Sequence, residues 1–170
     1  INLFIARNEK DKASDYLISF ARIMRLTLEN SQEETVLVEK EVEFLTNYLS
    51  LEQLRMKNFD FRIKVDDTIK GGRIPPFLIQ PLIENSIQHG FKGIDYRGEL
   101  LVRIGKRNTR LVVEVIDNGL GMPQQSAPKD ESPEHQSFAL SILRQRLANY
   151  SPTLGRLDFG AGKVAHENPG

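Results

Sequence analysis

The stretch Gln80–Gly90, with the sequence QPLIENSIQHG, decides the fold because it predicts a short helix with one apolar, buried face and one densely polar face. The apolar residues that recur at helical spacing in and beside it are Leu78, Leu82, Ile83 and Ile87. The polar residues that form a second face of the same short helix are Glu84, Asn85, Gln88 and His89. A carboxylate, a carboxamide and an imidazole side by side suit metal and phosphate chemistry. The stretch therefore predicts a helix with a chemical role.

Composition excludes several classes of protein. With 170 residues and an apolar fraction of 39%, the chain can form a packed core. Its 23 basic residues balance its 23 acidic ones, so a general binder of nucleic acid is not indicated. The absence of cysteine excludes disulfides and thiolate metal sites. No apolar run approaches the roughly 20 residues of a membrane span.

The first part of the chain has helical periodicity. Residues 1–57 predict two helices, with a break in the polar run Glu29–Thr35. The first helix has an apolar stripe, and the second has two apolar sides, which implies two packing partners. An antiparallel helical hairpin that also touches a second protomer or domain satisfies both sides.

After Lys57 the periodicity changes to that of strands. Phe59–Val65 alternates apolar and polar residues, which predicts a half-buried strand. Two further strands are predicted at residues 100–105 and 111–116, joined by a polar turn. Pro81 is compatible only with the first turn of its helix. A long loop is predicted at residues 122–136 and a helix at residues 137–150. Two closing strands are predicted at residues 154–159 and 163–167.

A second motif, DNGLG at Asp117–Gly121, follows the strand-like run Val112–Ile116. Alone, Asp-Asn-Gly is more often a turn signal than a site. Together with the polar helix, however, it resembles the N box and first glycine box of the Bergerat-type ATP-binding fold, which sensor histidine kinases, gyrase-type ATPases and Hsp90 share. The resemblance implies that Asp117 accepts a hydrogen bond from the adenine amino group, while Gly119 and Gly121 let backbone and ligand approach closely.

The residues around the helix narrow this resemblance to the LytS/YehU-type sensor histidine kinases. Pro76–Asn85 with His89-Gly90 looks like the N box of that family. Three upstream stretches resemble its helical motifs, and they are Met24–Leu28, Val38–Glu41 and Tyr48–Arg55. The match covers nearly the whole chain. It implies an α+β fold, in which an N-terminal helical hairpin precedes a Bergerat-type α/β sandwich with a mixed sheet.

The resemblance also implies two domains with different roles. Residues 1–57 are expected to be a partial dimerisation and histidine-phosphotransfer hairpin, and residues 58–170 an ATP-binding catalytic domain. ATP and Mg²⁺ are the implied cofactors, with Asn85 as the metal ligand and Glu84 as a catalytic residue that orients water or polarises the attacking group. The expected nucleotide-binding residues are Asn85, His89, Asp117, Gly119, Gly121 and Arg146.

The family's activity is ATP-dependent phosphorylation of a histidine, followed by transfer to an aspartate of a response regulator. Such kinases are usually homodimers through the helical hairpin, and their sensor and membrane segments lie upstream. The present chain lacks a starting Met and opens inside an apolar pattern at Ile1–Ile5, so we expect a fragment from the cytoplasmic part of an inner-membrane protein. The phosphoacceptor motif of the family is absent, and we expect that the fragment does not autophosphorylate by itself.

The second glycine box departs from the family pattern. Ser137 and Ala139 replace two glycines that let the backbone approach triphosphate, and Ile142 replaces a polar Asn. An alternative is therefore a degenerate kinase that acts as a dimeric signalling scaffold with weak or no ATP binding. A gyrase- or chaperone-like ATPase fits the N box, but the helical motifs before residue 60 argue against it.

Overall fold

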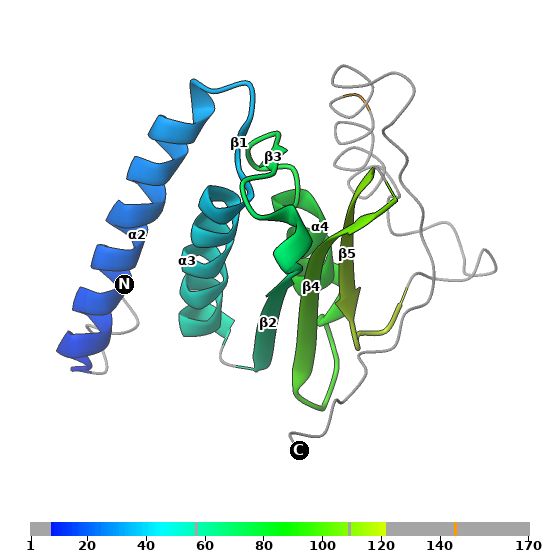
Figure 1. The fold of residues 1–170 in the computed structure, drawn as a ribbon. Coiled ribbons are helices and arrows are strands. Elements are labelled where there is room, and N and C mark those ends of the chain that lie inside the picture. The colour runs from blue at the N-terminus through cyan, green and yellow to red at the C-terminus, as the bar shows by residue number, and fades with distance from the viewer. Residues whose placement is uncertain (1–7, 57, 109, 122–144, 146–170) are drawn as a thin grey trace. The chain divides into compact units, whose positions relative to one another are not determined.

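The computed structural model describes residues 8–56, 58–108, 110–121 and 145. Its helical elements are α2 (Lys10–Ser31), α3 (Val38–Met56), the 3-10 turn η1 (Asp67–Ile69), α4 (Gln80–Asn85) and the π-helical turn η2 (Ser86–Gly90). Its strands are β1 (Val36–Leu37), β2 (Phe59–Val65), β3 (Arg73–Ile74), β4 (Gly98–Arg107) and β5 (Arg110–Asp117) (Figure 1). This is the α+β class that the sequence predicts.

The chain forms two units. One contains the described residues up to Phe59 together with Ile69–Pro76, and the other contains Asp60–Thr68 and the described residues from Phe77 onward. The chain therefore passes from one unit to the other more than once.

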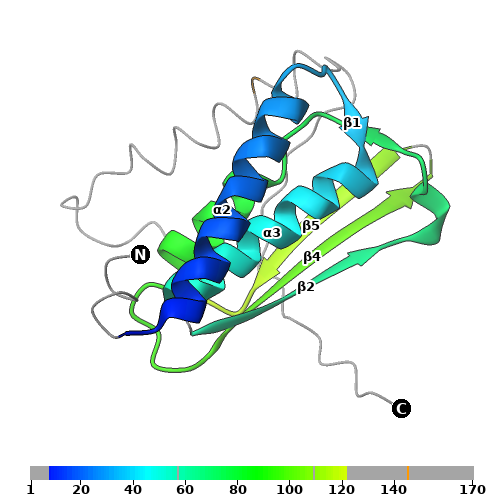
Figure 2. The same cartoon turned by 90° about the vertical axis from the view of Figure 1, so that its left-hand side faces the viewer.

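The predicted helical hairpin is present in the first unit. Helices α2 and α3 lie side by side in both views (Figures 1 and 2), and Arg22 Nη2 lies 2.6 Å from Glu43 Oε1 across them. Helix α2 continues to Ser31, beyond the point where the polar run predicted a break. The apolar residues of α3 that are buried are Val38, Phe44, Leu45, Leu49 and Leu51.

A two-stranded antiparallel sheet completes this unit. Strand β1 directly precedes α3, and its Val36 and Leu37 pair with Ile74 and Arg73 of β3. The Val38 amide donates to the Gly72 carbonyl at 2.8 Å, and the Gly71 amide donates to Glu39 Oε1 at 2.9 Å. The sequence pattern does not predict these strands, because two residues are too few to show an alternation.

The second unit contains a three-stranded sheet in the order β2-β4-β5. Strands β4 and β5 form an antiparallel hairpin whose register runs from Arg107 opposite Arg110 to Leu100 opposite Asp117. Figure 2 shows β4 between the two other strands. The predicted strand at Phe59–Val65 and the predicted hairpin are confirmed. The long register places Asp117 at the end of the hairpin away from its turn.

The polar stretch forms α4 and then η2, and Pro81 lies in the first turn of α4 as predicted. The change to π-helical bonding was not predicted. It places a hydrogen bond from the Phe91 amide to the Ser86 carbonyl at 3.0 Å. Ile83 and Ile87 are buried, while Gln88 and His89 are exposed. A buried face and a polar face thus occur on one short segment.

The predicted loop at 122–136, the helix at 137–150 and the closing strands lie outside the described residues, apart from Gln145. The same holds for Arg146 and for the altered glycine box at Ser137, Ala139 and Ile142. In the part of the chain that the structure describes, no helix is both long enough and apolar enough to cross a membrane.

Candidate functional site

The polar helix and the DNGLG motif meet at one junction in the second unit. Ser86, the first residue of η2, donates its hydroxyl to Asp117 Oδ2 at 2.6 Å. The other carboxylate oxygen, Asp117 Oδ1, accepts the Gly119 amide at 3.0 Å. The Leu120 amide donates to the Gly90 carbonyl at 3.0 Å. These bonds fix both oxygens of Asp117 and join the end of β5 to the helix.

Two glycines make this close approach feasible. A Cβ on Gly119 would lie 2.2 Å from the Gly90 carbonyl oxygen and 2.7 Å from its Cα, which is closer than any real side chain lies. A Cβ on Gly90 would lie 3.0 Å from Asp117 Oδ1. Gly119 therefore needs to be glycine because of backbone proximity, whereas a Cβ at Gly90 would require the Asp117 carboxylate to shift by a few tenths of an ångström. Gly121 needs to be glycine for another reason, since its φ is +75° while the space around it is open.

The predicted site residues divide between this junction and its surroundings. Asp117 and Gly119 form the junction itself, and Gly121 follows it directly. Glu84 and Asn85 are half-buried at the end of α4, where Gln80 Nε2 donates to Glu84 Oε1 at 2.7 Å. His89 is exposed on η2. The partners in the junction bonds are Ser86 and Gly90, which are not among the predicted site residues.

Asn118, which the sequence pattern indicates only as part of a turn, makes further contacts beside the junction. Its Oδ1 accepts the Glu99 amide at 2.7 Å, and its Nδ2 donates to the Arg97 carbonyl at 3.2 Å. Its own carbonyl accepts the Tyr96 hydroxyl at 2.7 Å. Asn118 thus holds the segment before β4 against the end of β5. The tendency of Asn to bond nearby backbone was a signal for such a role.

An ion pair supports the same segment from β2. Arg97 Nη2 donates to Asp60 Oδ1 at 2.7 Å, and Arg97 Nε donates to Asp60 Oδ2. The hydrogen bond from this guanidinium lowers the pKa of Asp60 below its ordinary value. Because the charged form is favoured in the folded state, its stabilising effect is present above the ordinary pKa and is lost as the pH falls through the lowered one.

We expect Arg97→Gln to raise the pKa of Asp60 toward its ordinary value of 3.8. The measurement is an NMR titration of the side-chain carboxyl carbons. Asp66 is the matched control, because its pKa is lowered by the Thr68 amide, which donates to Asp66 Oδ1 at 2.9 Å. An unchanged Asp60 pKa in the variant would show that the ion pair does not persist in solution.

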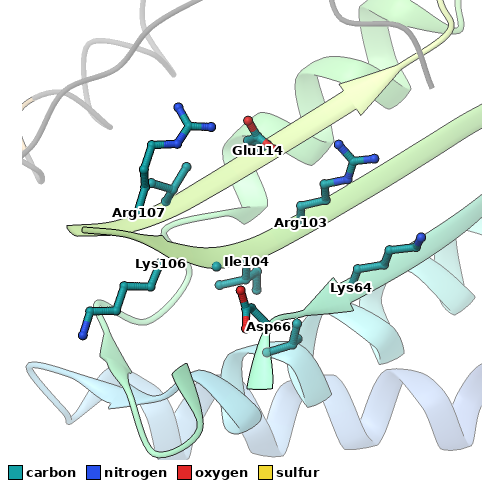
Figure 3. Close-up of a pocket in the computed structure, with 10 residues that line it drawn as sticks. Lys64, Asp66, Arg103, Ile104, Lys106, Arg107 and Glu114 are labelled. Atoms are coloured by element: carbon teal, nitrogen blue, oxygen red, sulfur yellow. The ribbon is translucent and has the colours of Figure 1, made fainter. Parts of the chain in front are cut away.

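A hollow of about 360 Å³ lies at the turn end of the hairpin, away from Asp117. Its charged lining residues are Lys64, Asp66, Arg103, Lys106, Arg107 and Glu114 (Figure 3). Arg103 and Glu114 are opposite one another in the β4–β5 register, so two of these opposite charges face each other. The hollow does not include the polar helix or the DNGLG motif and is separate from the candidate site.

Within the described residues, no three histidine, aspartate or glutamate side chains gather as a metal-binding group. Asp117 is the hydrogen-bond acceptor shared by Ser86 and Gly119 at the junction. An ionised carboxylate has about four lone-pair sites, and Ser86 and Gly119 occupy two of them. The arrangement is thus a rigidly held acceptor that suits a ligand with an N–H donor.

Known proteins resemble this chain in sequence and in fold. A family profile described as histidine kinase matches residues 1–59. The chain is 37% identical to the sensor protein LytS of Staphylococcus saprophyticus over 126 residues, which are 74% of this chain and 21% of that protein. It is 30% identical to the sensor protein LytS of Enterococcus faecalis over 176 residues, which cover 97% of this chain and 30% of that protein.

A solved structure shows the same fold. It is the histidine kinase domain of the blue-light activated histidine kinase of Erythrobacter litoralis EL346, with a TM-score of 0.50 and 16% identity, over 84% of this chain and 71% of that one. Residues 1–59 match the histidine kinase family. The chain as a whole is similar to the LytS sensor proteins, and it spans only about a fifth to a third of the length of the two LytS relatives named above.

Proposed function

We propose that the chain is the ATP-binding kinase region of a two-component sensor histidine kinase. The observation that carries the proposal is the junction at Asp117, where Ser86 Oγ lies 2.6 Å from the carboxylate and joins the polar helix to the DNGLG motif. In this proposal Asp117 selects adenine through its amino group. Residues 58–170 are the proposed ATP-binding domain, and residues 1–57 are a proposed partial dimerisation and histidine-phosphotransfer hairpin.

The other site residues take roles around this acceptor. Asn85 follows Glu84 at the end of α4 and contributes the carboxamide oxygen for Mg²⁺. Mg²⁺ commonly takes one or two protein oxygens, with phosphates and water supplying the others, so a single carboxamide fits it. Glu84 orients water or polarises the attacking group, and His89 faces phosphate. Gly119 and Gly121 permit close approach, and Arg146 is proposed to face the phosphates.

The reaction needs positioning more than covalent chemistry from the protein. When bound, Mg·ATP supplies the phosphoryl group that passes to a histidine. This chain's residues hold the adenine end at Asp117 and the metal end at Asn85, so the phosphate end is directed to a fixed place. We place the accepting histidine in a segment of the longer protein upstream of residue 1. From there the phosphoryl group passes to an aspartate of a response regulator.

We also propose a homodimer through the helical hairpin. Four apolar side chains of α2 lie three or four residues apart, and each is at least 46% exposed. These residues, here termed the α2 stripe, are Leu17, Phe20, Met24 and Leu28. A continuous apolar stripe on a helix is a typical contact for a second helix, and a second copy of this chain supplies one of the same length. The membrane anchor of this sensor is assigned to segments of the longer protein, with the kinase region on the cytoplasmic side.

The test is calorimetric titration with a Mg·ATP analogue, comparing the wild type with Asp117→Asn. We expect weak binding by the wild type and none detectable by the variant. The amide replaces an acceptor oxygen by a donor, and a hydrogen bond to a charged group contributes about 1.5–3 kcal/mol. Asp66→Asn, on the loop after β2, is the matched control and should bind like the wild type. Equal heats from the wild type and Asp117→Asn would remove the adenine assignment.

A second candidate function follows from the altered glycine box at Ser137, Ala139 and Ile142. In that case the chain is a degenerate kinase, a dimeric scaffold without phosphoryl transfer. Radiolabelled ATP added to a longer protein that includes the upstream helix separates the two candidates. Label on a histidine supports the kinase. Dimers that bind no ATP and acquire no label support the scaffold.

A further inference from the structure

The hydroxyl of Ser86 is held against Asp117 but has no role in the proposed function. Ser86 is 7% exposed and lies where α4 passes into η2. Its amide donates to the carbonyls of Ile83 and Leu82, and its carbonyl accepts the Phe91 amide at 3.0 Å. The backbone is therefore held on both sides, so the Oγ atom has little freedom to move away from Asp117.

Ser86 and Asp117 together offer hydrogen-bond acceptors to a ligand but no donor. A serine hydroxyl has a single proton, and Ser86 donates it to Asp117 Oδ2. The amide nearest the carboxylate, that of Gly119, donates to Asp117 Oδ1. What remains at the pair is lone pairs on the carboxylate and on Ser86 Oγ. The pair thus presents acceptors and no remaining proton to a ligand.

We propose that Ser86 is a positioning residue that makes the site discriminate between purines by the group at C6. An amino group at that position can donate to the acceptors, as in adenine. A carbonyl group, as in hypoxanthine, would face lone pairs without a donor, and such a mismatch is costly beside the buried Ser86 hydroxyl and the half-buried Asp117 carboxylate. This inference rests on the proposed function, because it assumes that the base lies at Asp117.

Substitution of Ser86 should change the discrimination rather than merely weaken binding. In Ser86→Ala the hydroxyl is gone and a water can take its place. A water has two protons, so it can donate to Asp117 and also to a 6-carbonyl group. The acceptor-only character of the pair is then lost. In Ser86→Thr the hydroxyl and its single proton are kept.

The experiment measures the affinities of the 170-residue chain for Mg·ATP and Mg·ITP by calorimetric competition. We expect the wild type to prefer ATP by about 10- to 100-fold. Ser86→Ala should reduce this preference to about threefold or less, and Ser86→Thr should restore it. Ser31→Ala, an exposed serine on α2, is the matched control and should keep the wild-type ratio.

The outcomes separate the inference from the function on which it rests. If the wild type binds ATP and Asp117→Asn does not, but Ser86→Ala keeps the full preference for ATP, only the role of Ser86 is overturned. A merely structural role for Ser86 would weaken both nucleotides equally and leave the ratio unchanged, which also overturns it. If the wild type binds no ATP at all, the proposed function is overturned and the inference with it.

Discussion

Gly119→Ala is expected to destabilise the chain by about 3–5 kcal/mol and to abolish ATP binding. The new methyl group would lie 2.2 Å from the Gly90 carbonyl oxygen, so the two backbones would have to separate. Separation breaks the bond from Leu120 N to Gly90 O and that from Ser86 Oγ to Asp117, each worth about 1 kcal/mol or more. The strain of overpacking adds about 1–3 kcal/mol.

Urea unfolding followed by circular dichroism measures the change in stability. Gly105→Ala is the matched control in the same unit, because its new Cβ would lie 3.6 Å from the Asp66 Cβ, an ordinary contact. We expect that variant to be as stable as the wild type or slightly more stable, since alanine suits a strand better than glycine. Similar unfolding midpoints for the two variants would contradict the close approach of Gly90 and Gly119.

Phe20→Lys combined with Met24→Lys is expected to convert the proposed dimer into monomers. Both side chains belong to the α2 stripe and are 46% exposed. Because each side chain is already about half buried, burying the rest of it contributes about 0.7–1.5 kcal/mol, and two copies each lose two of them. The new ammonium groups would also repel one another across the interface. The dissociation constant should therefore rise by at least about a hundredfold.

Size-exclusion chromatography with light scattering, over a range of concentrations, measures this effect. The matched control is Leu111→Lys, on β5, where an apolar side chain that is 39% exposed receives the same charge. That variant should remain a dimer. A double variant that stays dimeric would place the interface away from the α2 stripe, and a monomeric wild type would remove the dimer proposal.

Local patterns predicted most of the elements. The alternation of Phe59–Val65 identified β2 in full, and the apolar spacing with Pro81 located α4. Two features were not predictable from such patterns. The π-helical bonding at Ser86–Gly90 has no periodicity of its own over five residues. The sheet of β1 and β3 joins residues that are far apart in sequence, and neither strand is longer than two residues.

The candidate site was predictable as residue types but not as contacts. The sequence predicted Asp117 and Gly119 as site residues, because Asp-Asn-Gly after a strand is informative when a polar helix accompanies it. Ser86 and Gly90 were overlooked, since a serine and a glycine in a helix carry no signal until their neighbours across the fold are known. The junction depends on how closely two backbones approach, and spacing along one chain does not encode that distance.

The sheet of β1 and β3 also governs how the chain can be divided. Segment Ile69–Pro76 belongs to the helical unit but lies between parts of the other unit, so the polypeptide crosses at residues 59–60, 68–69 and 76–77. A piece that starts at Asp60 would keep Ile74, which is 0% exposed, but lose Val36, its pairing partner. Each unit thus consists of two separate segments of the sequence, so neither unit can be obtained by a single cut.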